Sequence, residues 1–116
     1  MAVILVADDE EIVRNFASTV LRKAGHVVLD ACDGFQAVAL YRSSGDRIDL
    51  VITDIAMPVM DGPEAVQLIR AARPGARILC MSGNSGELCP LGVPFLKKPF
   101  TPDDLCATVS ELLAAG

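Results

Sequence analysis

Aromatic residues are scarce in this chain, which has no tryptophan, one tyrosine and four phenylalanines among its 116 residues. Because 52% of the residues are nevertheless apolar, the core has to be built mainly from aliphatic side chains and methionine. This composition favours a compact α/β interior over disorder. A chain of this length can form one core, and we expect residues 1–116 to make up a single domain.

Basic residues are in the minority: ten lysines and arginines face fifteen acidic residues, and the formal net charge is −5. A negative chain repels the phosphate backbone, so we expect no direct binding to nucleic acid. Long apolar runs are absent too. The first run, Val3–Ala7, is far too short to cross a bilayer, and no basic signal segment precedes it. We therefore expect no membrane insertion and a cytoplasmic location.

Clusters of cysteine and histidine with metal-binding spacing are also missing. The four cysteines, at positions 32, 80, 89 and 106, form no C-x-x-C pair, and His26 is the only histidine. This spacing argues against a zinc site. We interpret the cysteines as reduced, small core-type residues of a cytosolic protein. His26 is interpreted as a solvated or locally hydrogen-bonded side chain.

What the sequence does contain is an alternation of short apolar segments with amphipathic ones. The pattern predicts strands over 3–7, 26–31, 48–53, 77–81 and 95–97, and helices over 11–24, 35–42, 63–73 and from 102 onward. Thr101 and Asp104 are typical of a capping box at the start of the last helix. The alternation indicates an α/β fold with a doubly wound parallel sheet, whose ligands bind beyond the carboxyl ends of the strands.

Polar residues suited to chemistry stand at those strand ends. Asp8 and Asp9 follow the first strand, and Asp54, Ser82 and Lys98 follow the third, fourth and fifth. Three converging carboxylates repel one another unless a positive charge lies among them, and oxygen ligands select a hard cation such as Mg²⁺. A nucleotide site would instead need a glycine-rich loop after the first strand, where this chain has four acidic residues.

Each of these residues has an ordinary explanation when it is taken alone. Asp8 and Asp9 suit the acidic first turn of a helix. Asp54 could be the solvated end of a strand, and Lys98 could be a surface lysine. Ser82 could be a turn residue. Their shared position at one edge of the sheet favours a common site over these separate explanations.

Five motifs lie at these strand ends and in the loops that follow: LVADDE at 5–10, TDIAMP at 53–58, MDG at 60–62, MSG at 81–83 and KKPF at 97–100. In this order they resemble the motifs of the response-regulator receiver family, over essentially the whole chain. The resemblance implies one receiver domain over residues 1–116 with a flavodoxin-like, five-stranded parallel sheet of order 2-1-3-4-5. It also implies a phosphoacceptor function in a two-component or phosphorelay system.

The resemblance further implies roles for the site residues. Asp54 would attack a phosphohistidine or a small phosphodonor, with Mg²⁺ held by the Asp9 and Asp54 carboxylates and the Ala56 backbone carbonyl. Asp8 would act through water. Phosphoryl transfer depends on alignment and charge neutralisation more than on a general base. The expected partner is a histidine kinase or a histidine phosphotransfer protein, with a downstream effector or a fused kinase as a further partner.

The fourth and fifth strands would carry the response to phosphorylation. Lys98 would pair with the phosphoryl oxygens while Lys97 faces away, and the peptide bond before Pro99 would be cis. Ser82 would hydrogen-bond the phosphoryl group. Phe95 would then occupy the space that the loop after the fourth strand vacates. The resemblance thus implies a two-state switch biased by a local change in charge.

The chain departs from the family pattern between Ser82 and Lys98, where receivers usually have a full helix. The fifteen residues 83–97 include glycines at 86 and 92 and prolines at 90 and 94, and both residue types disfavour helix. We predict that this helix, the fourth of the family, is shortened or absent. Phosphorylation could then act by ordering the segment.

Two other functions compete with this interpretation. An Mg²⁺-dependent phosphohydrolase that forms an aspartyl-phosphate would carry a second aspartate two residues after the nucleophile, where this chain has Ala56. A phosphorylation-independent, receiver-like scaffold would have lost an acidic residue or the lysine, and none is missing. We expect a module that catalyses only its own phosphorylation and dephosphorylation and is not an enzyme for other substrates. The sequence leaves open whether it is a stand-alone regulator, a shuttle in a phosphorelay or the receiver of a larger protein such as a hybrid histidine kinase.

Overall fold

The computed structural model describes residues 1–44, 47–83 and 92–115. Its strands are β1 (Val3–Ala7), β2 (Val27–Ala31), β3 (Leu50–Asp54), β4 (Ile78–Ser82) and β5 (Phe95–Lys97), and its helices are α1 (Glu11–Lys23), α2 (Gly34–Ser44), α3 (Gly62–Ala72) and α4 (Pro102–Ala114). The strands form one sheet of order 2-1-3-4-5, and every neighbouring pair is parallel. The expected doubly wound α/β fold and its strand order are confirmed.

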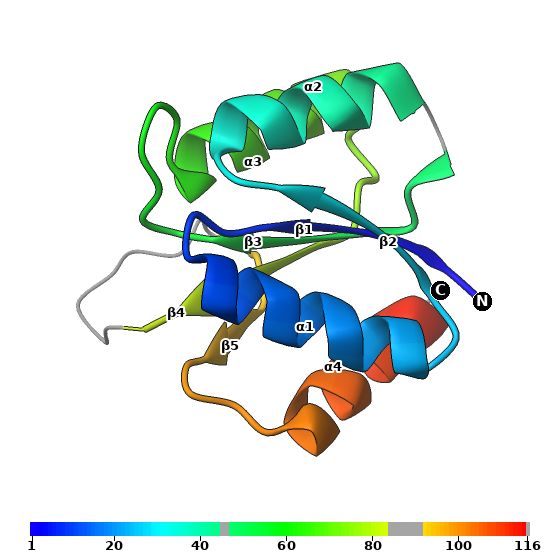
Figure 1. The fold of residues 1–116 in the computed structure, drawn as a ribbon. Coiled ribbons are helices and arrows are strands. Elements are labelled where there is room, and N and C mark those ends of the chain that lie inside the picture. The colour runs from blue at the N-terminus through cyan, green and yellow to red at the C-terminus, as the bar shows by residue number, and fades with distance from the viewer. Residues whose placement is uncertain (45–46, 84–91, 116) are drawn as a thin grey trace.

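Helices cover both faces of the sheet (Figure 1): α2 and α3 lie on one side, and α1 and α4 lie on the other. Successive residues of a strand point to opposite faces. Leu5 and Val51 therefore join the core with α2 and α3, while Ile4 and Leu50 join the core with α1 and α4. Both β3 and β4 are buried along their whole length, and the core is mainly aliphatic, as the composition predicted.

The register of the sheet brings the carboxyl ends of the strands to one edge. Ala7 at the end of β1 pairs with Thr53 of β3, and Ser82 at the end of β4 pairs with Lys97 at the end of β5. The residues that follow β1 and β5 and the residue that ends β3 therefore lie at the same edge. This is where ligands bind in sheets of this type.

Three of the described helices begin with side-chain caps, among them α2, where Oδ1 of Asp33 accepts the N–H of Gln36 at 2.8 Å, and α1 does not. The side chain of Asp61 accepts the backbone N–H of Glu64 at 3.0 Å at the start of α3. Thr101 and Asp104 form the predicted capping box at the start of α4. The N-cap position of α1 is Glu10, whose side chain makes no capping hydrogen bond. The Glu10 carboxylate is therefore available for other contacts.

Element bounds differ from the predicted ones by a few residues at most. For example, α2 continues to Ser44, two residues beyond its predicted end, and the Ser43 hydroxyl donates to the Leu40 carbonyl in its last turn. The predicted loss of the family's fourth helix concerns residues 83–97, of which 84–91 lie outside the described residues. None of the described helices has the length and apolarity that crossing a membrane requires.

Of the described cysteines, Cys80 is buried as a core-type residue should be, but Cys32 is exposed and Cys106 is half-buried, so the core interpretation is wrong for Cys32. Positions 32, 80 and 106 form no disulfide bond with one another, and position 89 lies outside the described residues. Nδ1 of His26 accepts the backbone N–H of Ala2 at 3.1 Å. This hydrogen bond lies near the start of β1, at the opposite end of the strand from Asp8.

The loop between β3 and α3 contains a strained residue. Val59 has φ +68° and is 84% exposed, and around it the N–H of Met60 donates to the Pro58 carbonyl at 2.7 Å. Such a three-residue turn is rare, and positive φ is unfavourable for a β-branched residue. The exposed side chain recovers little of this cost by packing.

We expect Val59→Asn to stabilise the protein by about 1 kcal/mol, because asparagine tolerates positive φ much better than valine. Urea unfolding at neutral pH measures the change. Val59→Thr is the matched control, since threonine is polar but still β-branched, and it should give no gain. An equal gain from both variants would attribute the effect to polarity and contradict strain as its cause.

Candidate functional site

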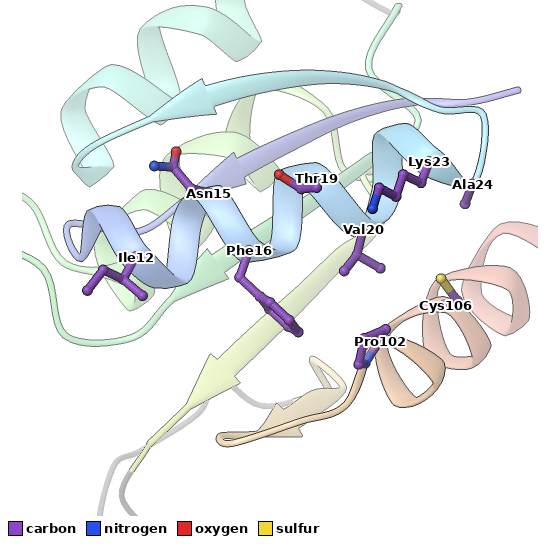
Figure 2. A pocket seen from close by; sticks show the side chains of 9 residues that line it. All are labelled: Ile12, Asn15, Phe16, Thr19, Val20, Lys23, Ala24, Pro102 and Cys106. Carbon is purple, nitrogen blue, oxygen red and sulfur yellow. The ribbon is translucent and has the colours of Figure 1, made fainter.

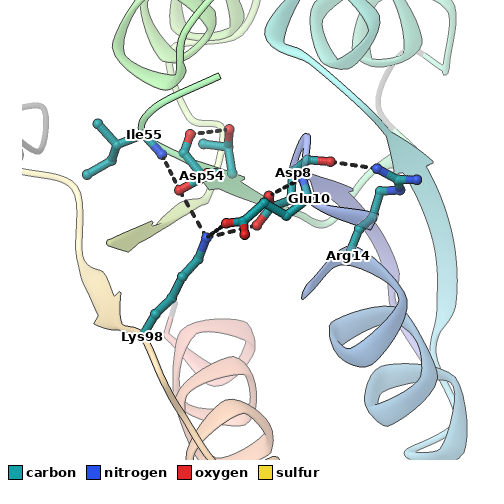
Figure 3. A network of polar contacts seen from close by, with 7 residues as sticks. Asp8, Glu10, Arg14, Asp54, Ile55 and Lys98 are labelled. Carbon is teal, nitrogen blue, oxygen red and sulfur yellow. Dashed lines mark hydrogen bonds and ion pairs between the residues drawn. The ribbon is translucent and has the colours of Figure 1, made fainter. Parts of the chain in front are cut away.

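Asp8, Asp54 and Lys98 meet at the carboxyl edge of the sheet (Figure 3). Nζ of Lys98 lies 3.0 Å from Oδ2 of Asp8 and 3.3 Å from Oδ1 of Asp54. Asp8 is fully buried, and Asp54 is 5% exposed. The structure therefore brings together three of the residues selected from the sequence, in a largely dry setting where charges interact strongly.

Backbone hydrogen bonds fix both carboxylates. Oδ1 of Asp8 accepts the N–H of Glu10 at 2.9 Å, and the Arg14 guanidinium donates to the Asp8 carbonyl at 2.8 Å. Oδ1 of Asp54 accepts the N–H of Ile55 at 2.9 Å. The start of α1 and the end of β3 thus orient the two side chains before any ligand arrives.

Gly62 packs directly on the backbone of Asp54. A Cβ atom at Gly62 would lie 2.2 Å from the Asp54 carbonyl oxygen and 2.9 Å from Cα of Ile55. The N–H of Gly62 also donates to the Ile55 carbonyl at 2.8 Å. Only glycine allows this approach, which fixes the start of α3 against the end of β3 and closes the loop that carries Ala56.

The surroundings of Asp54 favour its protonated form. Burial, followed by repulsion from Asp8, raises the pKa of Asp54 from 3.8 to about 6, although Lys98 and the Ile55 N–H act in the opposite direction. A carboxylate whose ionisation is opposed in this way gains from an added cation. A strongly shifted pKa in a cluster of charges is also a common property of functional sites.

The surroundings of Lys98, in contrast, favour its charged form. Burial alone would lower the pKa of Lys98, but the hydrogen bond to Asp8 and the attraction of Asp54 and Asp8 outweigh it, so that its pKa lies above the ordinary 10.5. The ammonium group therefore stays charged at neutral pH. It offsets part of the negative charge of the site.

A third carboxylate completes the group. Oxygen atoms of Asp8, Glu10 and Asp54 lie within 4.8 Å of one another, and Oε1 of Glu10 is 3.7 Å from Nζ of Lys98. Three carboxylates against one ammonium leave an excess of negative charge, and an all-oxygen set suits a hard divalent cation. The cluster is therefore compatible with a metal site.

Sequence reasoning selected Asp9 as a ligand and missed Glu10. Asp9 is exposed and is not part of the group of three carboxylates. The signal for Glu10 was present, because it belongs to the acidic run after β1. Residue type alone does not show which members of such a run turn toward the site. Ala56, the predicted carbonyl ligand, lies exposed two residues after Asp54.

The other predicted residues lie on β4 and β5. Ser82 is buried at the end of β4, and its carbonyl accepts the N–H of Lys98 at 2.7 Å. Phe95 begins β5 and is 58% exposed. Lys97 is exposed, and the peptide bond between Lys98 and Pro99 is cis, as the resemblance implied.

Two hollows flank α1. One, of about 440 Å³, reaches the site and is lined by Glu10, Phe16, Lys98 and Phe100 among others. The other, of about 700 Å³, runs between α1 and α4 and includes Phe16 and Cys106 (Figure 2). None of the nine residues that line the second hollow is acidic. The hollow that contains an acidic residue, Glu10, and that reaches the site is therefore the one of about 440 Å³.

Comparison with known proteins gives consistent matches. A family model described as the response regulator receiver domain matches residues 4–110. The sensor kinase CckA of Brucella abortus is 31% identical over 97% of this chain, which spans only 12% of the length of that kinase. The receiver protein CpdR of Brucella abortus is 32% identical and is covered over 98% of its length by 97% of this chain. The structure of TrrA from Thermotoga maritima in complex with Mg²⁺ and BeF has a TM-score of 0.85 and 32% identity, over 97% of this chain and 99% of that one.

Proposed function

Because the chain belongs to the response regulator receiver family of two-component systems, we propose that Asp54 accepts a phosphoryl group from a phosphohistidine of a kinase or a phosphotransfer protein. In this step an oxygen of the Asp54 carboxylate forms a bond to phosphorus. The bond between phosphorus and the donor nitrogen breaks, and its electron pair stays on the imidazole. The observation that carries the proposal is the buried Asp54 carboxylate in contact with Lys98 and beside Asp8.

Asp54 and Lys98 have separate tasks in this reaction. An ionised carboxylate is already a nucleophile, so Asp54 needs orientation more than activation, and the Ile55 N–H supplies it. The Lys98 ammonium is a point charge, and it can stabilise the negative charge that develops on the phosphoryl oxygens. Asp8, which is fully buried, keeps Lys98 at the site.

The proposed cofactor is Mg²⁺. The residues that would hold it are Asp9, Asp54 and the backbone carbonyl of Ala56, with Asp8 acting through water. When it is bound, the cation neutralises charge on the phosphoryl oxygens. The all-oxygen character of the site supports this choice, and so does the Mg²⁺ in the TrrA complex.

We also propose that Ser82 and Phe95 form the switch. Ser82 is buried at the site edge, where its hydroxyl would bond the new phosphoryl group. Phe95, which pairs with Cys80 on the neighbouring strand, would turn from its exposed position toward the space that opens when the loop after β4 moves. The result would be a changed surface for an effector or a fused kinase.

The wider assignment follows from this chemistry. We propose that residues 1–116 form one receiver domain in the cytoplasm, where kinase donors act, and that it catalyses only its own phosphorylation and dephosphorylation. The two core layers lie on opposite faces of a single sheet, which supports one domain. Ala56 takes the place of the second aspartate that the phosphohydrolase alternative needs.

Intact-mass measurement after incubation with Mg²⁺ and acetyl phosphate tests the proposal. The wild type should gain the mass of one phosphoryl group, Asp54→Asn should gain none, and chelation of Mg²⁺ should abolish the gain. Asp103→Asn, the same substitution at an exposed position on α4, should behave as the wild type. An adduct that persists in Asp54→Asn would refute the assignment, and turnover of a simple phosphate ester would favour the phosphohydrolase.

A further inference from the structure

Glu10 does not do what its position in the helix suggests. It occupies the N-cap of α1, but its side chain makes no capping hydrogen bond. Oε1 lies instead 3.7 Å from Nζ of Lys98, the residue that follows β5. Figure 3 shows the Glu10 carboxylate turned toward the ammonium group beside Asp8.

The three carboxylates around Lys98 differ in how firmly they are held. The Asp8 side chain is fully buried at 3.0 Å, and the Asp54 side chain is 7% exposed at 3.3 Å. The Glu10 side chain is 63% exposed at 3.7 Å. Glu10 is therefore the one partner that water can replace at small cost, because exposed ion pairs are weak.

We propose that Glu10 is a positioning residue that holds the Lys98 ammonium at the mouth of the unphosphorylated site and gives it up when a phosphoryl group arrives on Asp54. This inference rests on the proposed function of Asp54. A lysine ammonium has three donor hydrogens, and here three carboxylates already surround it. A phosphoryl group adds further anionic oxygens, so a partner has to leave, and the exposed Glu10 is the weakest.

The position of Glu10 explains how this residue can hold the Lys98 ammonium and then release it. Its backbone N–H is bonded to Oδ1 of Asp8, while Oδ2 of the same carboxylate contacts Lys98. The main chain of Glu10 is thus fixed to the site, and only its side chain has to move. Release of Lys98 would not disturb the start of α1.

NMR of the lysine side-chain ammonium groups tests the contact directly. Glu10→Gln should shift the Nζ and Hζ resonances of Lys98 in the metal-free protein and speed exchange of its ammonium protons with water. Glu11→Gln removes the same charge from the next residue, which lies outside the group of three carboxylates, and should leave these signals unchanged. Lys98 signals in Glu10→Gln that match the wild type would overturn the proposal.

Binding of beryllofluoride, a phosphoryl mimic, at saturating Mg²⁺ tests the release. Glu10→Gln should bind it about threefold more tightly than the wild type, which is the range expected for loss of one exposed competing ion pair. Glu11→Gln should change the affinity less. Equal affinities in the two variants would overturn the release step. Failure of the wild type to bind the mimic would count against the proposed function instead, and the NMR comparison would still decide the role of Glu10.

Discussion

Lys98→Met is expected to slow phosphorylation by acetyl phosphate at least about 100-fold, the usual loss when one preorganised charge is removed from a transition state. The same substitution should lower the free energy of unfolding of the metal-free protein by about 3 kcal/mol. Lys98 contacts Asp8, Glu10 and Asp54, and without it two of these carboxylates stay buried without that cation. Intact-mass time courses and urea unfolding measure the two effects.

Lys97→Met is the matched control for this prediction. Lys97 is the adjacent residue, and its side chain is exposed, so its loss should change neither rate nor stability appreciably. Addition of Mg²⁺ should restore part of the stability of Lys98→Met, because the cation neutralises the buried carboxylates. It should not restore the rate, because the variant still lacks the positive charge that Lys98 places beside the phosphoryl oxygens. A wild-type rate in Lys98→Met would remove Lys98 from the mechanism.

Patterns in the sequence were sufficient to predict the fold and to bring Asp8, Asp54 and Lys98 to one place. Strands buried in a parallel sheet appear as continuous apolar runs, and their carboxyl ends share an edge. The residue after such a run is therefore located without knowledge of any side-chain conformation. The capping box of Thr101 and Asp104 was predictable for a similar reason, since it depends on residues close in sequence.

Side-chain directions and close backbone contacts could not be predicted in the same way. Asp9 and Glu10 are neighbouring acidic residues, and only the geometry at the start of α1 turns Glu10 toward Lys98. The positive φ of Val59 is a second example. A β-branched residue is the last one expected there, and its conformation is set by the loop that Gly62 closes against Asp54.

Asp54→Asn is expected to stabilise the metal-free protein by about 2 kcal/mol at pH 7. The pKa of Asp54 is raised from 3.8 to about 6 by burial and by Asp8, and an interval of this size corresponds to about 3 kcal/mol at most. Between these two values the folded state binds more protons than the unfolded state, so stability falls as the pH rises. The wild type thus loses stability from about pH 4 to about pH 6, and the asparagine variant avoids this loss.

Urea unfolding in the presence of a chelator, from pH 4 to pH 7.5, measures the difference between the two proteins. The advantage of Asp54→Asn should be close to zero at pH 4, grow up to about pH 6 and then stay constant. Asp103→Asn should show no such profile. Because a bound cation favours the ionised carboxylate, Mg²⁺ should stabilise the wild type more than Asp54→Asn and reduce the advantage of the variant. If the advantage were the same at every pH, the stabilisation would come from packing. Repulsion between carboxylates within the site would then not be the reason that Asp54 favours a cation, and it would not be the reason that Asp54 needs the positive charge of Lys98.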